Sequence, residues 1–421
     1  MVELWAKGRV AVRSLAQKGF FNLLLALGAV QVISFTLKIL LGRWLSSEDF
    51  ARVSLVLETH SLLATVMTLA LPTAMIRFGL AEGRLDEYLA GTMRLFGLWA
   101  LITLGGFYLL LSLVAVFTDP LVQSWLYVTA AVAPGLALFN YLINWLSARR
   151  QTSARAWLVF SQRALYALGL GLGAQGGGLI GALWGFLGQG LLFTLALLGL
   201  FGRWLFAQTQ ALDLKALVRF SAVDSVGHLA GFASGFVLLW MAERRLELAQ
   251  VSWLAMALSF TVVAKFFFAS LYNVMYPYLM ERNDRTGFVR QLRSVLGLGA
   301  VMGLGLALVA MWLVPYLIHW MLPPRFDAAG DLFRWLIWGE SLIGLCLILE
   351  MALEVLGAVR LKAVALGAAL ALLTLLGWVL MARWGALGAV WAFLAAAGLR
   401  LVWLSLGCWW ILRKPSDQPL F

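Results

Sequence analysis

Charge is scarce in this sequence: charged residues make up 12% of the 421 residues, whereas apolar residues make up 62%. A soluble domain has about 25% charged residues, so this composition excludes an ordinary water-soluble fold. Lipid is the solvent that suits so much apolar surface. Because lipid offers no partners to unpaired backbone groups, an open chain crosses it only as helices.

Cysteine and histidine are also rare, with two of the first and three of the second. Cys346 and Cys408 both lie in long apolar runs, so we expect neither a disulfide nor a metal site. No nucleophile–base pair stands out, and the outer loops are short for a membrane enzyme such as a glycan polymerase, ligase or acyltransferase. We therefore expect a protein without enzyme activity and without a cofactor.

A membrane-spanning helix needs roughly 20 mainly apolar residues, and twelve runs qualify. The first run is too long for the apolar core of a signal peptide and lacks a cleavage site, so it is expected to be the first span. We predict an all-α polytopic membrane protein of twelve transmembrane helices. The runs are 20–41, 51–78, 94–117, 121–147, 156–174, 178–201, 217–240, 251–280, 294–320, 331–355, 361–382 and 385–412.

An internal repeat divides the chain. The motif Gly-x-x-Gly-Ala-x-Trp-x-Phe occurs at 178–186 and again at 385–393. Two glycines three residues apart share one helix face, which lets a neighbouring backbone approach closely. Copies nearly half a chain apart suggest two similar halves, as in many transporters, and an even number of spans per half makes the halves parallel. The predicted parts are a basic N-terminal segment 1–18, an N-lobe 19–201, a linker 202–216, a C-lobe 217–412 and a tail 413–421.

The net charge of +12 is explained by membrane topology. Lys and Arg gather at both termini and in the even-numbered loops. This positive-inside pattern predicts that both termini are cytoplasmic, and it leaves no reason to expect a nucleic acid partner. The odd-numbered loops hold only Arg43, Arg244, Arg245, Arg325 and Arg383.

The stretch Gly42-Arg43-Trp44-Leu45-Ser46-Ser47-Glu48-Asp49-Phe50-Ala51 resembles the first connection of polysaccharide transporters, a Gly-Arg-x-Leu-Ser-x-x-Glu-Phe-Gly-type run, with Ala51 in place of the usual glycine. The repeated Gly-x-x-Gly-Ala element is similar to the sixth and twelfth spans of the same family. This family is the Wzx-type branch of the multidrug/oligosaccharidyl-lipid/polysaccharide (MOP) exporter superfamily.

The resemblance implies a V-shaped cavity between two six-helix lobes, lined largely by spans one, two, seven and eight. It also implies transfer of an undecaprenyl-diphosphate-linked oligosaccharide, such as an O-antigen or exopolysaccharide repeat unit. The transfer would run from the cytoplasmic to the periplasmic leaflet of the bacterial inner membrane. A glycan polymerase or other polysaccharide-assembly membrane proteins would be further partners.

Charges inside spans are expensive, so each is a candidate for function. Lys265 lies midway along the eighth predicted span, too deep to reach the interface easily. Facing lipid it would cost about 3 kcal/mol or more, whereas in a wet cavity it could meet a diphosphate. The alternative is an internal ion pair with a carboxylate.

Four further cations of the predicted spans are candidates for substrate binding. Lys38 and Arg52 flank the outer ends of spans one and two, where they either contact substrate or extend to the interface. The resemblance adds that lipid II flippases hold diphosphate with cations in spans one, two and eight, the spans of Lys38, Arg52 and Lys265. Arg163 and Arg400 lie deep in spans five and twelve; they either bind substrate or, as we favour, pair with a glutamate of span ten.

Four other groups are candidates for proton coupling, because a carboxylate or imidazole in a partly dry cavity takes up and releases protons. Asp224 and His228 are four residues apart and share one helix face, and Glu58 and His60 lie in the second span. A satisfied hydrogen bond between helices is the alternative for each. We predict an ion- or proton-coupled flippase with alternating access; the alternative is a cation-coupled multidrug exporter of the same superfamily, whose cavity should be rich in carboxylates.

Overall fold

The computed structural model describes residues 20–205, 212–262, 264–265, 267–268, 271–272, 279 and 285–413, and every element within them is a helix. The segment 1–18, the middle of the linker 202–216 and nearly all of the tail 413–421 lie outside these residues. The first half of the chain forms α2 (Phe20–Trp44), α3 (Ser47–Thr68), α4 (Leu71–Ala81), α5 (Leu85–Leu113), α6 (Pro120–Thr129), η1 (Ala130–Val132), α7 (Ala133–Ala148) and α8 (Thr152–Leu205). The second half forms α9 (Leu214–Arg245), α10 (Leu248–Phe260), α12 (Arg285–Met321), η2 (Pro324–Phe326), α13 (Asp327–Val355) and α14 (Val359–Arg413).

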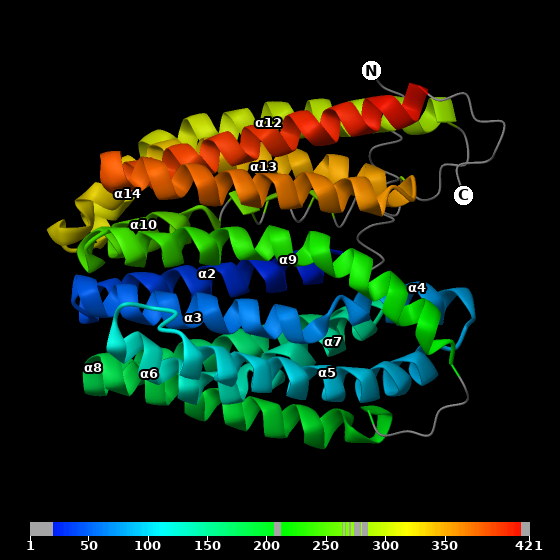
Figure 1. Ribbon diagram of the computed structural model, residues 1–421, viewed down its shortest axis with the longest axis horizontal. Coiled ribbons are helices and arrows are strands. Elements are labelled where there is room, and N and C mark those ends of the chain that lie inside the picture. Colours follow the sequence, from blue (N-terminus) through cyan, green and yellow to red (C-terminus); the bar gives the residue numbers. More distant parts are fainter. Residues whose placement is uncertain are drawn as a thin grey trace.

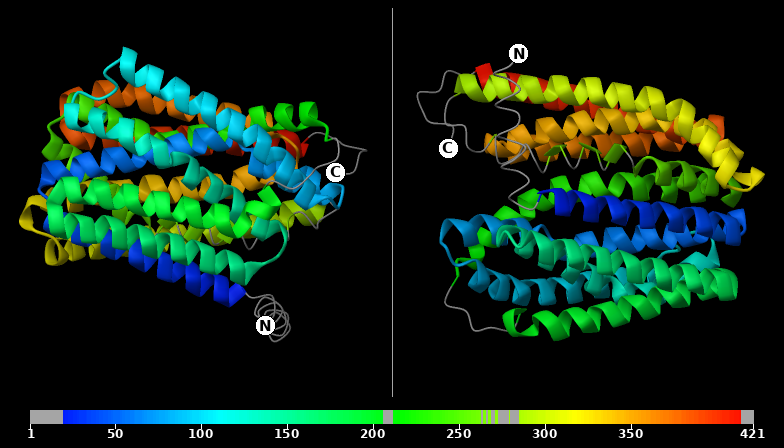
Figure 2. Two further views of the ribbon diagram at one scale, coloured as in Figure 1. Left: turned by 90° about the horizontal axis from the view of Figure 1, so that it is seen from below. Right: turned by 180° about the vertical axis from the view of Figure 1, so that it is seen from behind.

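The helices lie in two groups with their axes roughly side by side (Figure 1, Figure 2). We call α2–α8 the first bundle and α9–α14 the second bundle; α2 and α9 lie in the middle, where the bundles meet. The loops gather at two ends. We call these the Ser46 end, which holds the loop between α2 and α3, and the Gly83 end, which holds the loop between α4 and α5.

Two very long helices, α8 with 54 residues and α14 with 55, each double back at a turn. α8 turns at Gly177–Gly178 and α14 at Trp384–Gly385. The second residue of each turn has nearly the same conformation, with φ 58° and ψ −137° at Gly178 and φ 57° and ψ −140° at Gly385. Residues with side chains rarely adopt such a conformation. The first glycine of the repeated motif therefore makes a turn, and each long helix supplies two spans.

The second glycine of each motif allows the close approach that the sequence predicts. A Cβ on Gly181 would collide with the carbonyl oxygen of Gly173, and a Cβ on Gly388 would collide with that of Leu380. Residues eight apart in one straight helix could not touch, because they would lie about 12 Å apart along the axis. The contact between Gly181 and Gly173 thus shows two antiparallel arms packed backbone to backbone.

We expect Gly385→Ala to lower the free energy of unfolding by about 1–3 kcal/mol, the usual cost of a residue in a sparsely populated backbone region. A Cβ at this position would also lie 2.8 Å from Oε1 of Gln250, an oxygen that accepts a hydrogen bond from the N–H of Ala386. Thermal unfolding in detergent measures the loss. Gly398→Ala is the matched control, because Gly398 lies within α14 with open space around its Cβ position. Equal melting of the two variants would contradict this account.

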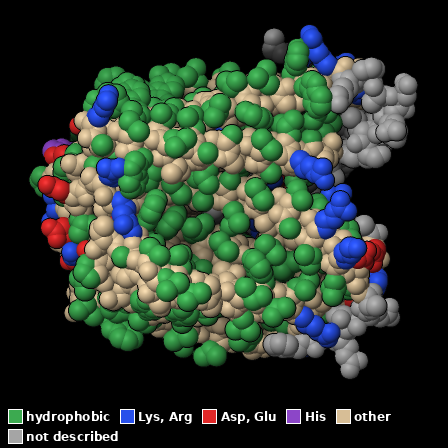
Figure 3. Space-filling model, in the orientation of Figure 1, with side chains coloured by type: hydrophobic (Ala, Val, Ile, Leu, Met, Phe, Trp, Pro, Cys, Tyr) green, Lys and Arg blue, Asp and Glu red, His purple; other side chains and the backbone are tan. Residues whose placement is uncertain are grey.

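Seven described segments are long and apolar enough to cross a membrane, and the bent pair within α9 makes an eighth. Two of these segments, α8 and α14, cross twice. Together with α2, and with α10 and the described residues after it, they account for the twelve predicted spans. Trp312, Trp320 and Leu113 are 71%, 72% and 73% exposed, and hydrophobic side chains cover most of the face in Figure 3. Because soluble monomers rarely expose so much apolar surface, this is a multi-pass membrane protein.

Candidate functional site

The space between the bundles holds charges far from either end. Glu58 lies near the middle of α3 and is exposed, and the side chain of Lys265 is 54% exposed. A charge facing lipid at this depth would cost about 3 kcal/mol or more, so these two side chains line a wet space. Figure 3 shows the surface hollowed between the bundles. We call this space the central hollow.

Lys265 contacts a carboxylate of the second bundle. Its Nζ lies 3.1 Å from Oε1 of Glu340, whose side chain is only 3% exposed. The hydroxyl of Thr261 donates to the same oxygen over 3.3 Å. The ion pair considered as an alternative for Lys265 is therefore present, yet more than half of the lysine side chain still faces the central hollow.

Glu58 and three cations form one charge cluster. The charges of Glu58 and Arg163 both act on Lys38, and the charge of Glu58 also acts on Lys265. Lys38 places its Nζ 5.6 Å from the ring centroid of Phe50. Because Lys38 and Arg163 belong to the first bundle and Lys265 follows α10, the cluster joins both bundles across the central hollow.

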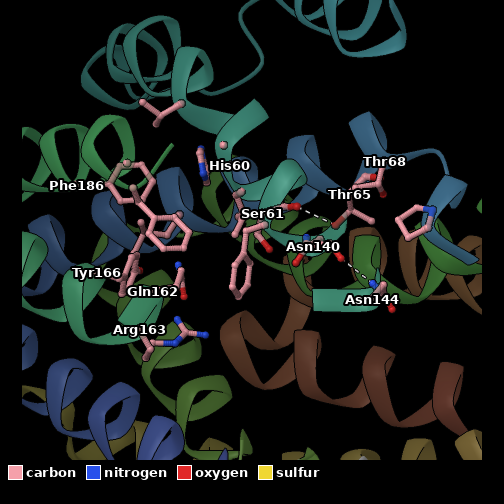
Figure 4. Close-up of a pocket in the computed structure, with 18 of the residues that line it drawn as sticks. His60, Ser61, Thr65, Thr68, Asn140, Asn144, Gln162, Arg163, Tyr166 and Phe186 are labelled. Carbon is pink, nitrogen blue, oxygen red and sulfur yellow. Dashed lines mark hydrogen bonds between the residues drawn. The ribbon is translucent and has the colours of Figure 1, made fainter. Parts of the chain in front are cut away.

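A polar cavity of about 460 Å³ lies within the first bundle and includes Arg163 in its wall (Figure 4). Helices α3, α4, α7, α8 and α9 line it, and its described lining contains no Asp or Glu. We call it the amide pocket, after its four carboxamides. Its polar lining consists of His60, Ser61, Thr65, Thr68, Thr73, Asn140, Asn144, Gln162, Arg163, Tyr166, Gln189 and Ser225.

A break between α3 and α4 shapes one end of the amide pocket. Leu69 and Ala70 have left-handed backbone conformations, with φ 45° and 47°, and Pro72 follows in the first turn of α4. Proline cannot supply the N–H that a continuous helix needs. The single helix predicted over 51–78 is therefore broken, and the break brings Thr68 and Thr73 to the pocket wall.

Aromatic rings stand at the other end of the amide pocket. The ring of Phe186 meets His60 edge-on, with centroids 4.8 Å apart, and meets Tyr166 edge-on at 6.1 Å. His60 is 6% exposed, and its Nδ1 lies 3.3 Å from the carbonyl oxygen of Thr129. The two candidates of the second predicted span thus have different surroundings, because Glu58 is exposed and His60 is buried.

Hydrogen bonds between the bundles close the Ser46 end. Glu243 of α9 accepts the backbone N–H of Thr118 over 2.7 Å and that of Asp119 over 2.9 Å. Arg325 of η2 donates to the carbonyl oxygen of Leu45 over 2.7 Å. Residues of the first bundle and residues of the second are thus tied together at this end.

Arg52 lies in this closed end. Its Nε donates to Asp119 over 2.8 Å and its Nη1 donates to Asp49 over 2.9 Å, with Glu48 at 3.8 Å. Three carboxylates therefore surround it. Arg52, a predicted substrate-binding cation, is thus held in ion pairs at the Ser46 end. Lys38 and Lys265, by contrast, interact with Glu58.

Buried charges in the second bundle form ion pairs around two cations, Arg400 and Lys362. Arg400 is 8% exposed and donates to Oε1 of Glu350 over 2.8 Å from Nε and 2.5 Å from Nη2. Lys362 is 3% exposed and lies 2.6 Å from Glu354 and 3.6 Å from Asp224. Arg400 is thus paired with a glutamate of α13, as favoured from the sequence, and its guanidinium is occupied by that pairing.

One sequence-based interpretation, the pairing of Arg163, is wrong, and the one for Asp224 and His228 stays a prediction. The pairing of Arg163 with a glutamate of α13 is absent: its Nε has no hydrogen-bond partner in the described chain. Asp224 lies beside Lys362 in the buried cluster, and the side chain of His228 lies outside the described residues. Lys362 was overlooked because it stands at the edge of the predicted span 361–382, where lysines usually extend to the interface.

The amide pocket was also overlooked, although a signal for it exists. Asn140 and Asn144 are four residues apart inside the predicted span 121–147, so they share one helix face. Polar side chains at membrane depth turn toward protein or water. A search of the spans for carboxamides would have found these two, together with Gln162 and Gln189.

No protein-family model and no curated protein matches this sequence. Solved structures do. The chain is similar to lipid II flippase MurJ in an inward closed conformation, with a TM-score of 0.72 and 13% identity over 92% of this chain and 87% of that chain. It is also similar to a multidrug resistance MATE family transporter of the MOP superfamily in an inward-facing conformation, with a TM-score of 0.71 and 14% identity over 92% of this chain and 96% of that chain.

An outward-facing conformation of a multidrug resistance MATE family transporter of the MOP superfamily gives a TM-score of 0.60, with 16% identity over 93% of this chain and 97% of that chain. At such identities the likeness establishes the fold. The protein is a multi-pass, all-helical membrane protein with the fold of the MOP superfamily transporters, as the sequence predicts.

Proposed function

We propose that the chain is a flippase that moves an undecaprenyl-diphosphate-linked oligosaccharide between the leaflets of a bacterial inner membrane. The observation that carries the proposal is the cluster of Lys38, Arg163 and Lys265 with Glu58, an exposed carboxylate near the middle of α3. Cations held in a wet hollow attract an anionic headgroup, and a guanidinium forms paired hydrogen bonds with phosphate oxygens.

The charge balance of the cluster supports an anionic cargo. Glu340 neutralises Lys265 in part, and the charge of Glu58 acts on Lys38 and Lys265. Arg163 keeps an unpaired Nε, and no carboxylate lines the described wall of the amide pocket beside it. A net positive charge is therefore left for a diphosphate, while the polyprenyl tail would stay in lipid.

Alternating access is the mechanism that the arrangement suits. In the proposed orientation the Ser46 end faces the periplasm and both termini face the cytoplasm, in keeping with the distribution of Lys and Arg. The contacts of Glu243 and Arg325 would then close the outer side and leave the cytoplasmic side open to the headgroup. Rocking of the bundles would exchange these contacts for others at the Gly83 end. Protonation of Glu58, Asp224 or His60 would be the route by which an ion gradient drives the cycle.

A cation-coupled multidrug exporter is the second candidate. The similarity to MATE family transporters favours it as much as the similarity to MurJ favours a flippase. Glu58, exposed near the middle of α3, is a carboxylate that could attract an organic cation. The unpaired Arg163 counts against this candidate, because it would repel the same cargo.

Reconstitution in liposomes tests the proposal. We expect the purified protein to transfer lipid-linked oligosaccharide between leaflets, and Arg163→Gln to slow the transfer by about tenfold or more, because hydrogen bonds to charged groups are worth about 1.5–3 kcal/mol. Arg94→Gln is the matched control, since Arg94 is exposed on α5. The assay is run with and without a pH gradient, and with an organic cation in place of the glycolipid. Transport of the organic cation together with no movement of the glycolipid would replace the flippase by the exporter.

A further inference from the structure

Three carboxamides of the amide pocket have no hydrogen-bond partner within the described chain. Asn140 on α7, and Gln162 and Gln189 on the two arms of α8, all line the cavity (Figure 4). Asn144 does have one, because its Nδ2 donates to the backbone oxygen of Asn140 over 2.7 Å. The three side chains that lack one are half-buried, so their donors and acceptors are open to whatever fills the cavity. Because these three carboxamides face a cavity, a ligand in the cavity could supply the missing hydrogen bonds.

The chemistry of the wall selects a class of ligand. Each carboxamide presents two donor hydrogens and one acceptor oxygen, which match the hydroxyl and amide groups of a sugar. Tyr166 and Phe186 add ring surfaces for its apolar faces. An organic cation would find no carboxylate on the described wall, and a purely apolar ligand would leave the carboxamides unsatisfied.

The position of the amide pocket fits a sugar attached to a diphosphate. Arg163 belongs both to the pocket wall and to the cation cluster with Lys38. In Figure 4 its guanidinium lies below Gln162, on the same side of the cavity as Tyr166. Asn140 and Asn144 lie farther along the cavity. A diphosphate at Arg163 would therefore leave the first sugar directly beside the carboxamides. The volume of about 460 Å³ is in the usual range for a small-molecule site.

We propose that the amide pocket is a sugar-recognition subsite, in which Asn140, Gln162 and Gln189 bind the hydroxyl and amide groups of the sugar nearest the diphosphate. This inference rests on the proposed flippase function and adds a glycan specificity to it. The cation cluster binds the diphosphate, which all such lipids share. The amide pocket binds the first sugar, which differs between glycans.

Two lipid probes separate these contributions. One is undecaprenyl diphosphate without sugar. The other is the pool of undecaprenyl-diphosphate-linked glycans extracted from cells that naturally make this protein. The variants are Asn140→Leu and Gln189→Leu, alone and combined, because leucine keeps a similar bulk without donors or acceptors. Gln175→Leu is the matched control, since Gln175 is exposed near the turn of the same α8 hairpin. Binding is read by native mass spectrometry and transfer by the liposome assay.

We expect the double variant to bind and transfer the glycan-bearing probe about tenfold less well, with undecaprenyl diphosphate unchanged and Gln175→Leu like the wild type on both probes. Thermal unfolding in detergent shows whether the variants are folded. If the double variant does not fold, Gln162→Leu is tested in its place with the same two probes. An equal loss on both probes, or no loss on either, overturns the subsite while leaving the flippase intact. If the wild type binds and moves neither probe, the flippase proposal fails, and the subsite fails with it. Competition by the same glycan released from its lipid tells whether the pocket needs the lipid anchor; capture of the free glycan supports the subsite.

Discussion

Lys265→Ala is expected to reduce glycolipid transfer by about a hundredfold, the largest loss of any single substitution in the central hollow. Two effects act in the same direction. The ammonium group no longer meets the diphosphate, which costs about 1.5–3 kcal/mol. In addition Glu340, whose carboxylate lies 3.1 Å from Nζ in the native protein, loses its counter-charge, which makes the hollow less favourable to an anionic cargo. Transfer in liposomes, normalised to the amount of folded protein, measures the loss.

A double variant separates the two effects. If Lys265 only neutralises Glu340, then Lys265→Ala combined with Glu340→Gln should transfer glycolipid at the wild-type rate. If Lys265 also contacts the headgroup, the double variant should recover part of the loss and no more. Lys265→Arg keeps the charge and should stay within a few-fold of the wild type. Wild-type transfer by Lys265→Ala itself would remove this residue from the mechanism.

The fold could be predicted from the sequence because hydropathy and membrane thickness leave few choices. Apolar runs of the required length predict the spans, and the repeated glycine motif marks the hairpins of α8 and α14. The motif did not reveal that its first glycine makes the turn and only the second packs against the other arm. The break at Leu69–Ala70 was also hidden, because Pro72 lies in a largely apolar run and a hydropathy window averages over it.

The site was less predictable, since the sequence shows which charges lie in spans but not which of them meet. Lys38, Arg163 and Lys265 come from three distant segments, and the sequence does not show that Lys38 and Lys265 share Glu58 as a charged neighbour. Arg52 has the same apparent depth as Lys38, yet acidic side chains at the Ser46 end engage it. A pairing of this kind depends on helix rotation, and in a helix that is apolar on every side the sequence pattern defines that rotation poorly.

The charge clusters of the central hollow and of the second bundle differ in exposure. In the central hollow, Glu58 and Lys265 are exposed and their partners come from different bundles. In the second bundle, Arg400 and Lys362 are buried, and each is matched to carboxylates. A cargo could displace the contacts of the exposed Glu58 without leaving a buried charge unpaired. Displacing the buried ones would strand charges in a dry interior, which is far more costly.

Arg400→Leu should therefore destabilise the protein more than any substitution in the central hollow, by about 3–5 kcal/mol, because it leaves the carboxylate of Glu350 buried without its cation. Thermal unfolding in detergent measures the effect. Arg400→Leu combined with Glu350→Leu should regain most of the loss, since replacing both partners of a buried pair by apolar groups is often close to neutral. The double variant should also transfer glycolipid at nearly the wild-type rate. A double variant that folds like the wild type but transfers nothing would show that Arg400 binds the cargo. The cargo-binding charges would then include the ion pair of Arg400 in the second bundle as well as those of the central hollow.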